Sequence, residues 1–104
     1  NKYQKDSKCY ICGAETQLDF HHYYTLAPLV HKWLRENNLD PKYILAIRED
    51  FIEEHHDELY VHTVTLCHNH HRQLHKVYGR DPGLGTVHKQ KRWVEIQREK
   101  HGMV

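Results

Sequence analysis

The most informative part of the 104-residue chain is Val64-Thr65-Leu66-Cys67-His68-Asn69-His70-His71-Arg72-Gln73-Leu74-His75. It opens with apolar and β-branched residues, which favour a strand, and continues with helical spacing at His71, Leu74 and His75. Within it, Cys67-x-x-His70 has the spacing of a short metal-binding turn, and His71-x-x-x-His75 places two imidazoles on one helix face. The stretch therefore predicts a strand that leads into a helix beside metal ligands.

A second ligand pair lies near the start of the chain, at Cys9-x-x-Cys12. Together with Cys67 and His70 it can close around one tetrahedral zinc ion. A chain of this length buries little apolar surface, so a structural zinc would supply stability that the core lacks. The alternative is three buried free thiols, which the paired spacing disfavours. Thiolate ligation suits a reducing compartment, and we expect a cytoplasmic protein.

Periodicity and turn residues predict the remaining elements. We expect a knuckle over residues 8–13, a strand over Leu18–Tyr24 and a helix over Ala27–Asn37. A second helix should begin at Asp40-Pro41 and run to about His55, with Ile44, Ile47, Phe51 and Ile52 on its apolar face. A strand over Leu59–Leu66 and a helix from His68, stopped by Gly79, should follow. After the turn-rich stretch Arg80–Gly85, a last helix should run from Thr86 to Lys100 and make contacts through Val87, Val94 and Ile96.

Composition and charge narrow the class of protein. The chain is 38% hydrophobic and 28% charged, which is typical of a globular domain, and no apolar run is long enough to span a membrane. Residues 36–58 carry eight acidic against two basic side chains, whereas residues 80–104 carry six basic against three acidic. The basic segment suits a phosphate backbone and the acidic one should face away from it. On charge alone, two solvated helix faces would explain the same pattern.

The order of the motifs resembles the HNH endonuclease family. The resemblance rests on Cys9-Tyr10-Ile11-Cys12-Gly13, Leu18-Asp19-Phe20-His21-His22 and the stretch 64–75, and it covers the chain from about Lys8 to Tyr78. It implies an α+β fold, a small zinc-stapled ββα-metal domain of the treble-clef-like type. Residues 1–104 would form one domain, with a helical insertion at 25–58 and a C-terminal helix in the basic segment 80–104.

The resemblance also implies roles for the histidines. His22 would be the general base, and His21 and His71 would ligate a catalytic divalent ion, which could be Mn²⁺, Ni²⁺, Co²⁺, Mg²⁺ or Zn²⁺. His75 would either ligate the same ion or touch the scissile phosphate. The structural zinc would be held by Cys9, Cys12, Cys67 and His70.

Three departures from the family pattern affect these expectations. His70 stands where zinc-containing members usually have a fourth cysteine, and imidazole is an equally ordinary zinc ligand. His62 stands at the catalytic-motif position of the middle asparagine, where one ring nitrogen could brace the loop after the first histidines. The separation between His22 and His62 is large, so the acidic segment should be an insertion that serves as a lid or a protein-partner surface.

The expected activity is metal-dependent hydrolysis of phosphodiester bonds in double-stranded DNA. Contacts to DNA are expected from Arg72, Lys76, Lys89, Lys91 and Arg92. Two other functions fit the same residues: a catalytically inactive zinc module that binds DNA or a protein, and an adaptor that binds partners through its acidic insertion. The remaining histidines, at positions 31, 55, 56, 68, 88 and 101, are assigned no role. The start at Asn1, without an initiator methionine or signal-peptide pattern, is compatible with a piece of a longer protein.

Overall fold

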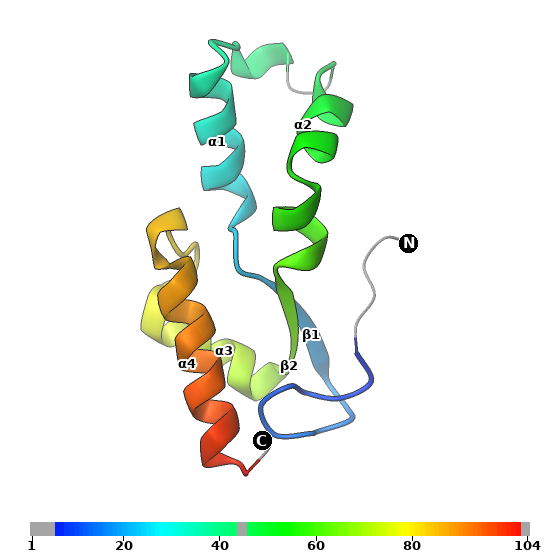
Figure 1. The fold of residues 1–104 in the computed structure, drawn as a ribbon, viewed down its shortest axis with the longest axis vertical. Helices are drawn as coiled ribbons and strands as arrows, with labels where there is room; N and C mark the ends of the chain where they lie inside the picture. The colour runs from blue at the N-terminus through cyan, green and yellow to red at the C-terminus, as the bar shows by residue number, and fades with distance from the viewer. Residues whose placement is uncertain (1–5, 44–45, 103–104) are drawn as a thin grey trace.

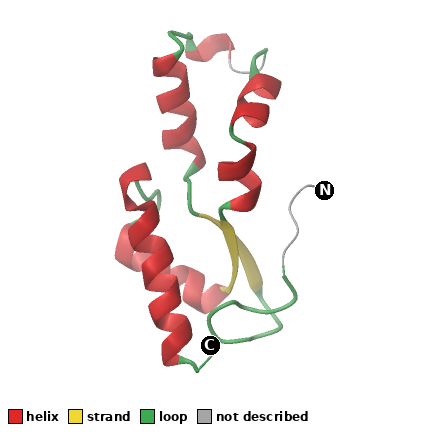
Figure 2. Ribbon diagram, in the orientation of Figure 1, coloured by secondary structure: helices red, strands yellow, loops and turns green. Residues whose placement is uncertain are grey.

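The fold is a small α+β arrangement of two antiparallel strands and several helices (Figures 1 and 2). The computed structural model describes residues 6–43 and 46–102. In chain order the elements are β1 (Leu18–His22), α1 (Leu26–Glu36), the 3-10 turn η1 (Pro41–Tyr43), α2 (Arg48–Glu54), the π-helical turn η2 (Asp57–Val61), β2 (Thr63–Cys67), α3 (His68–Tyr78), the 3-10 turn η3 (Leu84–Thr86) and α4 (Val87–Lys100).

The two strands pair in a register that runs from Leu18 opposite Cys67 to His22 opposite Thr63. The predicted strand at Leu18–Tyr24 is confirmed, although it ends at His22. The predicted strand Leu59–Leu66 was wrong in its first half, where Asp57–Val61 forms η2. Strand β1 ends opposite Thr63. Residues 59–62 therefore have no paired strand whose backbone could satisfy their N–H and C=O groups in a sheet. Leu59 instead packs among the helices that precede it.

The main core lies where the cysteine knuckle, β2, α3 and α4 meet. Its centre consists of side chains with no exposed surface, Ile11, Leu66, Leu74 and Val94. The predicted contacts of Val87 and Val94 from α4 are confirmed, and Trp93 packs against the same core. The predicted contact of Ile96 was wrong, since its side chain is 39% exposed. The core therefore holds α3 and α4 against the sheet.

The part of the chain that connects β1 to β2 contains α1 and α2. These two helices lie side by side as an arm that projects away from the sheet (Figure 1). A second apolar cluster holds the arm together, formed by Leu29, Trp33, Leu34, Phe51 and Leu59. The predicted helix Ala27–Asn37 is confirmed as α1.

The predicted continuous helix from Asp40-Pro41 to His55 was wrong. Asp40 Oδ1 does accept the backbone N–H of Lys42 at 3.0 Å, but only the 3-10 turn η1 follows. The α-helix begins at Arg48, so that Phe51 turns back to meet Trp33, with their rings 5.3 Å apart. Ile44, predicted on this apolar face, lies outside the described residues.

The two C-terminal helices follow the prediction closely. Helix α3 ends at Gly79, whose φ of +90° favours glycine. Thr86 precedes α4 as predicted, but its hydroxyl does not cap the helix; it donates to Gly83 O and accepts a hydrogen bond from Gln90 Nε2. Among the helices of residues 6–43 and 46–102, none has the length and apolar character needed to cross a membrane.

Replacing Gly79 should test how strictly α3 must end there. A Cβ at Gly79 would meet no atom within 4 Å, so the cost of Gly79→Ala is conformational, about 1–3 kcal/mol at this φ and ψ. Gly83 has φ −66° and equally open surroundings, so Gly83→Ala should change the free energy of unfolding by less than about 1 kcal/mol. Chemical denaturation of both variants measures the difference, and equal stabilities would contradict it.

Candidate metal centres and cleft

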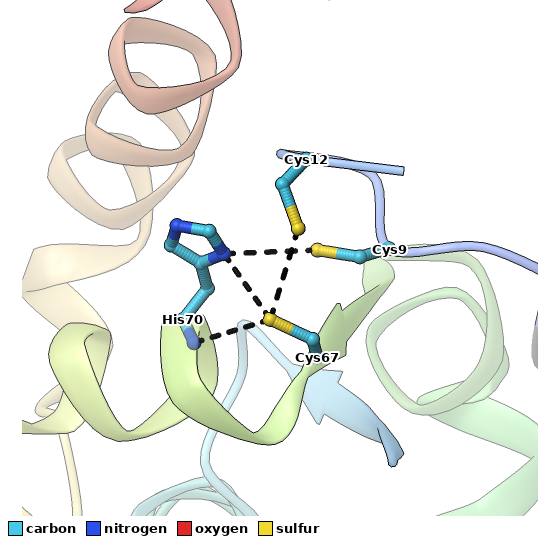
Figure 3. Close-up of side chains that lie close together, drawn as sticks. All are labelled: Cys9, Cys12, Cys67 and His70. Carbon is cyan, nitrogen blue, oxygen red and sulfur yellow. Dashed lines mark hydrogen bonds between the residues drawn. The ribbon is translucent and has the colours of Figure 1, made fainter. Parts of the chain in front are cut away.

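Four predicted zinc ligands, three thiols and one imidazole, converge at the junction of the knuckle, β2 and α3 (Figure 3): Cys9, Cys12, Cys67 and His70. Their ligand atoms all lie within 4.8 Å of one another. Cys12 Sγ is 3.9 Å from Cys67 Sγ, and Cys67 Sγ is 3.2 Å from His70 Nδ1. Two sulfurs on one tetrahedral zinc would be about 3.8 Å apart, since each Zn–S bond is about 2.3 Å. The four residues could therefore hold a metal ion.

The local backbone places these ligands. Gly13 adopts a φ of +78° and its N–H returns to Cys9 O, which closes the knuckle. Cys67 ends β2 and stands at the N-cap of α3, where its sulfur accepts the N–H of His70 at 3.5 Å. The chain thus turns from strand to helix at a ligand, which brings Cys67 and His70 to one side.

The thiols differ in acidity. Burial opposes ionisation of Cys9, but backbone N–H groups around it lower its pKa below the ordinary value. Burial raises the pKa of Cys12 to about 11, and the neighbouring Cys9 adds to this rise. Cys9 therefore ionises more easily than Cys12, which is opposed first by burial and then by the neighbouring Cys9. A bound cation would favour the ionised form of both thiols, since coordinated thiols lose their protons.

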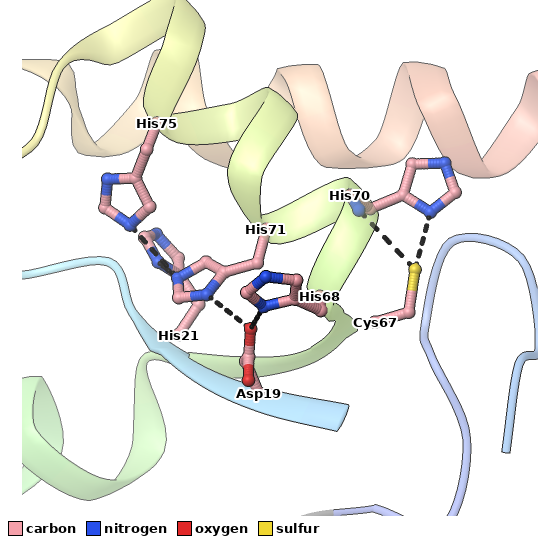
Figure 4. Close-up of polar contacts among 7 residues, drawn as sticks. All are labelled: Asp19, His21, Cys67, His68, His70, His71 and His75. Carbon is pink, nitrogen blue, oxygen red and sulfur yellow. Dashed lines mark hydrogen bonds and ion pairs between the residues drawn. The ribbon is translucent and has the colours of Figure 1, made fainter. Parts of the chain in front are cut away.

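A second cluster lies on the other side of α3, where His21 from β1 meets His71 and His75 (Figure 4). His21 Nδ1 is 3.1 Å from His71 Nε2, and His75 Nε2 is 3.0 Å from the same atom. Two nitrogens about 2.1 Å from one ion and at right angles would be about 3.0 Å apart. The sequence-predicted pair His21 and His71 is therefore brought together, and His75 joins it.

The other ring nitrogen of each histidine faces an oxygen acceptor. His21 Nε2 lies 2.8 Å from Gln90 Oε1, and His71 Nδ1 lies 3.1 Å from Asp19 Oδ2. His75 Nδ1 lies 2.9 Å from the carbonyl oxygen of Gly79. Each of these nitrogens must carry the proton, so the three converging nitrogens present lone pairs to one another. Lone pairs this close repel one another, and a bound cation would relieve that repulsion; oxygen acceptors of this kind orient histidines that bind metals.

Burial favours the neutral form of two of these imidazoles, His21 and His71. His21 is 3% exposed, and burial lowers its pKa to about 4, opposed by the hydrogen bond to Gln90. Burial also lowers the pKa of His71, although Asp19 works against this shift. Hydrogen bonds from His71 and His68 keep the pKa of Asp19 below its usual value despite burial. Neutral imidazole is the form that binds a metal ion.

The predicted base His22 lines the same cleft as the histidine cluster. The cleft has a volume of about 270 Å³, and its walls include His21, His22, His71, His75 and Arg80. Burial lowers the pKa of His22, so its ring is neutral and able to accept a proton near pH 7.

His62 lies outside the histidine cluster. Its carbonyl oxygen accepts the N–H of Tyr23 at 3.2 Å, just after β1, and its ring Nδ1 accepts from Lys91 Nζ at 3.1 Å. The backbone of His62 therefore braces the end of β1, while its ring holds α4. The expected bracing through a ring nitrogen was wrong in this detail, because the ring turns toward Lys91.

The predicted DNA contacts fall into two groups. Arg72 and Lys76 are exposed on α3 and line a second cleft of about 430 Å³ beside His71 and His75. Lys89 and Arg92 are exposed on α4. Lys91 is half-buried, bonded to His62 and 5.5 Å from the ring of Tyr23, so it is engaged within the protein.

Sequence reasoning missed four residues of the site: Asp19, His68, Arg80 and Gln90. Arg80 lines both clefts, although it was predicted only as part of a turn. His68 shares the Asp19 carboxylate with His71 at 3.1 Å. The adjacency of Asp19 to the histidine pair offered a signal, because carboxylates commonly orient metal-binding histidines. Nothing in the spacing of α4 pointed to Gln90.

The fold and these two clusters define a small α+β domain with candidate metal sites beside a basic cleft. The sequence model described as the nicking endonuclease family, of the phage T5 type, matches residues 1–103. The chain therefore belongs to the nicking endonuclease family, and membership implies DNA endonuclease activity on a DNA substrate. No solved structure matches the chain.

Binding of Co²⁺ should distinguish the cysteine cluster from the histidine cluster by its absorption spectrum. Co²⁺ at the cysteine site should give thiolate-to-metal absorption in the near ultraviolet, which Cys67→Ser should lose and His71→Ala should keep. Structural zinc contributes about 10–16 kcal/mol in small domains, comparable with the entire stability of about 5–15 kcal/mol, so chelation of this site should unfold the chain. A Cys67→Ser protein with unchanged absorption and folding would contradict the assignment.

Proposed function

We propose that the chain is an HNH-type endonuclease that nicks double-stranded DNA with a divalent ion held by His21, His71 and His75. The observation that carries this proposal is the convergence of three imidazole nitrogens whose opposite nitrogens all face oxygen acceptors. Family membership supports the DNA substrate. The separate cysteine site would hold the structural zinc of a ββα-metal, treble-clef-like domain.

His22 would act as the general base. Its neutral ring lines the cleft beside the three histidines, where it could take a proton from a water molecule. The water oxygen would attack phosphorus, and the bond from phosphorus to the 3′ oxygen would break. The 3′ oxygen would take a proton from solvent, which leaves a 3′ hydroxyl and a 5′ phosphate. A divalent ion supplies Lewis-acid stabilisation of the negative charge that develops during this displacement.

Cations flank the cleft on the side of α3. Arg80 borders both clefts, and Arg72 and Lys76 border the second. They would neutralise phosphates of the DNA backbone next to the scissile bond, a contact that positions the strand without reading its sequence. Lys89 and Arg92 on α4 would extend this contact with the DNA backbone. Lys91 instead donates a hydrogen bond to His62 within the protein.

Histidine at the middle motif position is compatible with activity. The residue at this position would have to brace the loop after β1. The carbonyl oxygen of His62 does so by accepting the N–H of Tyr23. A backbone contact does not depend on the identity of the side chain. The ring of His62 is thereby available to fix Lys91 and α4.

The test of the base is His22→Ala in a plasmid-nicking assay. Supercoiled plasmid with added Mn²⁺ should become open circles before linear molecules accumulate, and His22→Ala should slow nicking by about 10²–10⁴-fold, the usual contribution of a general base. Quantified gel bands against time give both rates. The structural metal content and the melting temperature should be unchanged.

His31→Ala is the matched control, because His31 is exposed on α1 in the arm. It should nick at the native rate. Metal-dependent nicking by His22→Ala at the native rate would contradict the assignment of the base. Binding of plasmid without cutting by the native protein, with any metal, would instead favour an inactive DNA-binding module.

The ligand set predicts metal preference. Mg²⁺ favours oxygen ligands, whereas Mn²⁺, Co²⁺ and Ni²⁺ accept imidazole nitrogen. Nicking rates with each of these three ions should at least equal the rate with Mg²⁺, measured at the same free concentration of metal. Strong activity in Mg²⁺ alone would contradict His21 and His71 as ligands.

A further inference from the structure

Gln90 on α4 is a completely buried polar side chain that contacts the histidine cluster. It is 0% exposed, and it lies beyond Tyr78, where the residues that resemble the HNH family end. Its amide makes three hydrogen bonds: Oε1 to His21 Nε2 at 2.8 Å, Nε2 to Tyr23 O at 3.3 Å, and Nε2 to Thr86 Oγ1 at 3.0 Å. Each polar atom of the amide therefore has a partner.

The contact with Tyr23 determines the orientation of the amide. A backbone carbonyl oxygen can only accept, so the –NH₂ of Gln90 must face Tyr23. Its carbonyl oxygen is thereby directed at His21 Nε2, which must donate. The single ring proton of the neutral His21 imidazole then sits on Nε2, and Nδ1 carries the lone pair.

We infer that Gln90 is a positioning residue that selects the tautomer of His21 and so presents His21 Nδ1 to the metal ion. This inference rests on the proposed function, and it extends the site to α4. The opposite tautomer would place a proton on Nδ1, 3.1 Å from His71 Nε2, and would block the metal site. Without the acceptor, neutral imidazole would be free to adopt either tautomer.

The experiment compares Gln90→Leu, which removes the acceptor, with Gln90→Glu, which keeps an oxygen facing His21. Titration calorimetry of the cysteine-site-loaded protein with Mn²⁺ measures affinity at the histidines. Gln90→Leu should weaken binding by about 10–100-fold, the usual effect of losing such a partner, and Gln90→Glu should recover most of the affinity. Gln97→Leu, the same exchange on α4 two turns away, should bind Mn²⁺ as the native chain does.

A second readout needs no variant. Nitrogen-15 NMR of the native protein, before Mn²⁺ is added, reports which ring nitrogen of His21 carries the proton. Protonated Nε2 with bare Nδ1 supports the inference, and protonated Nδ1 would overturn it even where Gln90→Leu fails to fold. Native affinity in a folded Gln90→Leu protein would also overturn it.

The same measurements separate this inference from the proposed function. A native chain that binds no Mn²⁺ at the histidines overturns the proposed function, and the NMR result then decides only whether Gln90 selects the tautomer of His21. A native chain that binds Mn²⁺ and nicks DNA, with full affinity in Gln90→Leu, overturns only the role of Gln90.

Discussion

The pairing of β1 with β2 is the constraint on which both clusters depend. Because β2 runs directly into α3 at Cys67, the register of the strands sets where α3 begins relative to β1. That register places His21 opposite Val64, so its ring reaches the first turn of the helix at His71. A slip by one residue would turn His21 to the opposite face of the sheet and separate the ligands.

Helix α3 contributes residues to both clusters, one on each of its sides. His70 and His71 are consecutive, and successive side chains on a helix point about 100° apart. His70 therefore joins the cysteines while His71 joins His21 and His75 (Figure 4). Helix α4 contacts both clusters, since His101 just beyond it packs against the ring of His70 and Gln90 bonds His21. Metal at the cysteines would thus hold α3 in the position that the histidine cluster needs.

Spacing alone predicted the parts of the molecule whose geometry is local. The knuckle, the helix from His68 to Gly79 and the two pairs Cys9 with Cys12 and Cys67 with His70 follow from offsets of three and four residues. The errors arose where distant partners decide the structure. Leu59 alternates like a strand residue, but β1 ends before it and the arm offers Trp33 and Phe51 as apolar contacts. Gln90 joined the site through contacts with residues 67 and 69 positions earlier, which no local pattern records.

On the proposed function, the distribution of charge would favour one direction for the approach of DNA. The net charge of +1 offers little long-range attraction, so the local arrangement of charge decides. The acidic side chains of α2 lie on the arm, whereas Arg72, Lys76 and Arg80 surround the clefts. At physiological salt a charge acts over about 8 Å, so the acidic arm repels only the DNA that passes close to it. On the proposed function, a duplex would therefore cross the α3 side of the molecule, with the arm as a boundary that limits how it lies against the cleft.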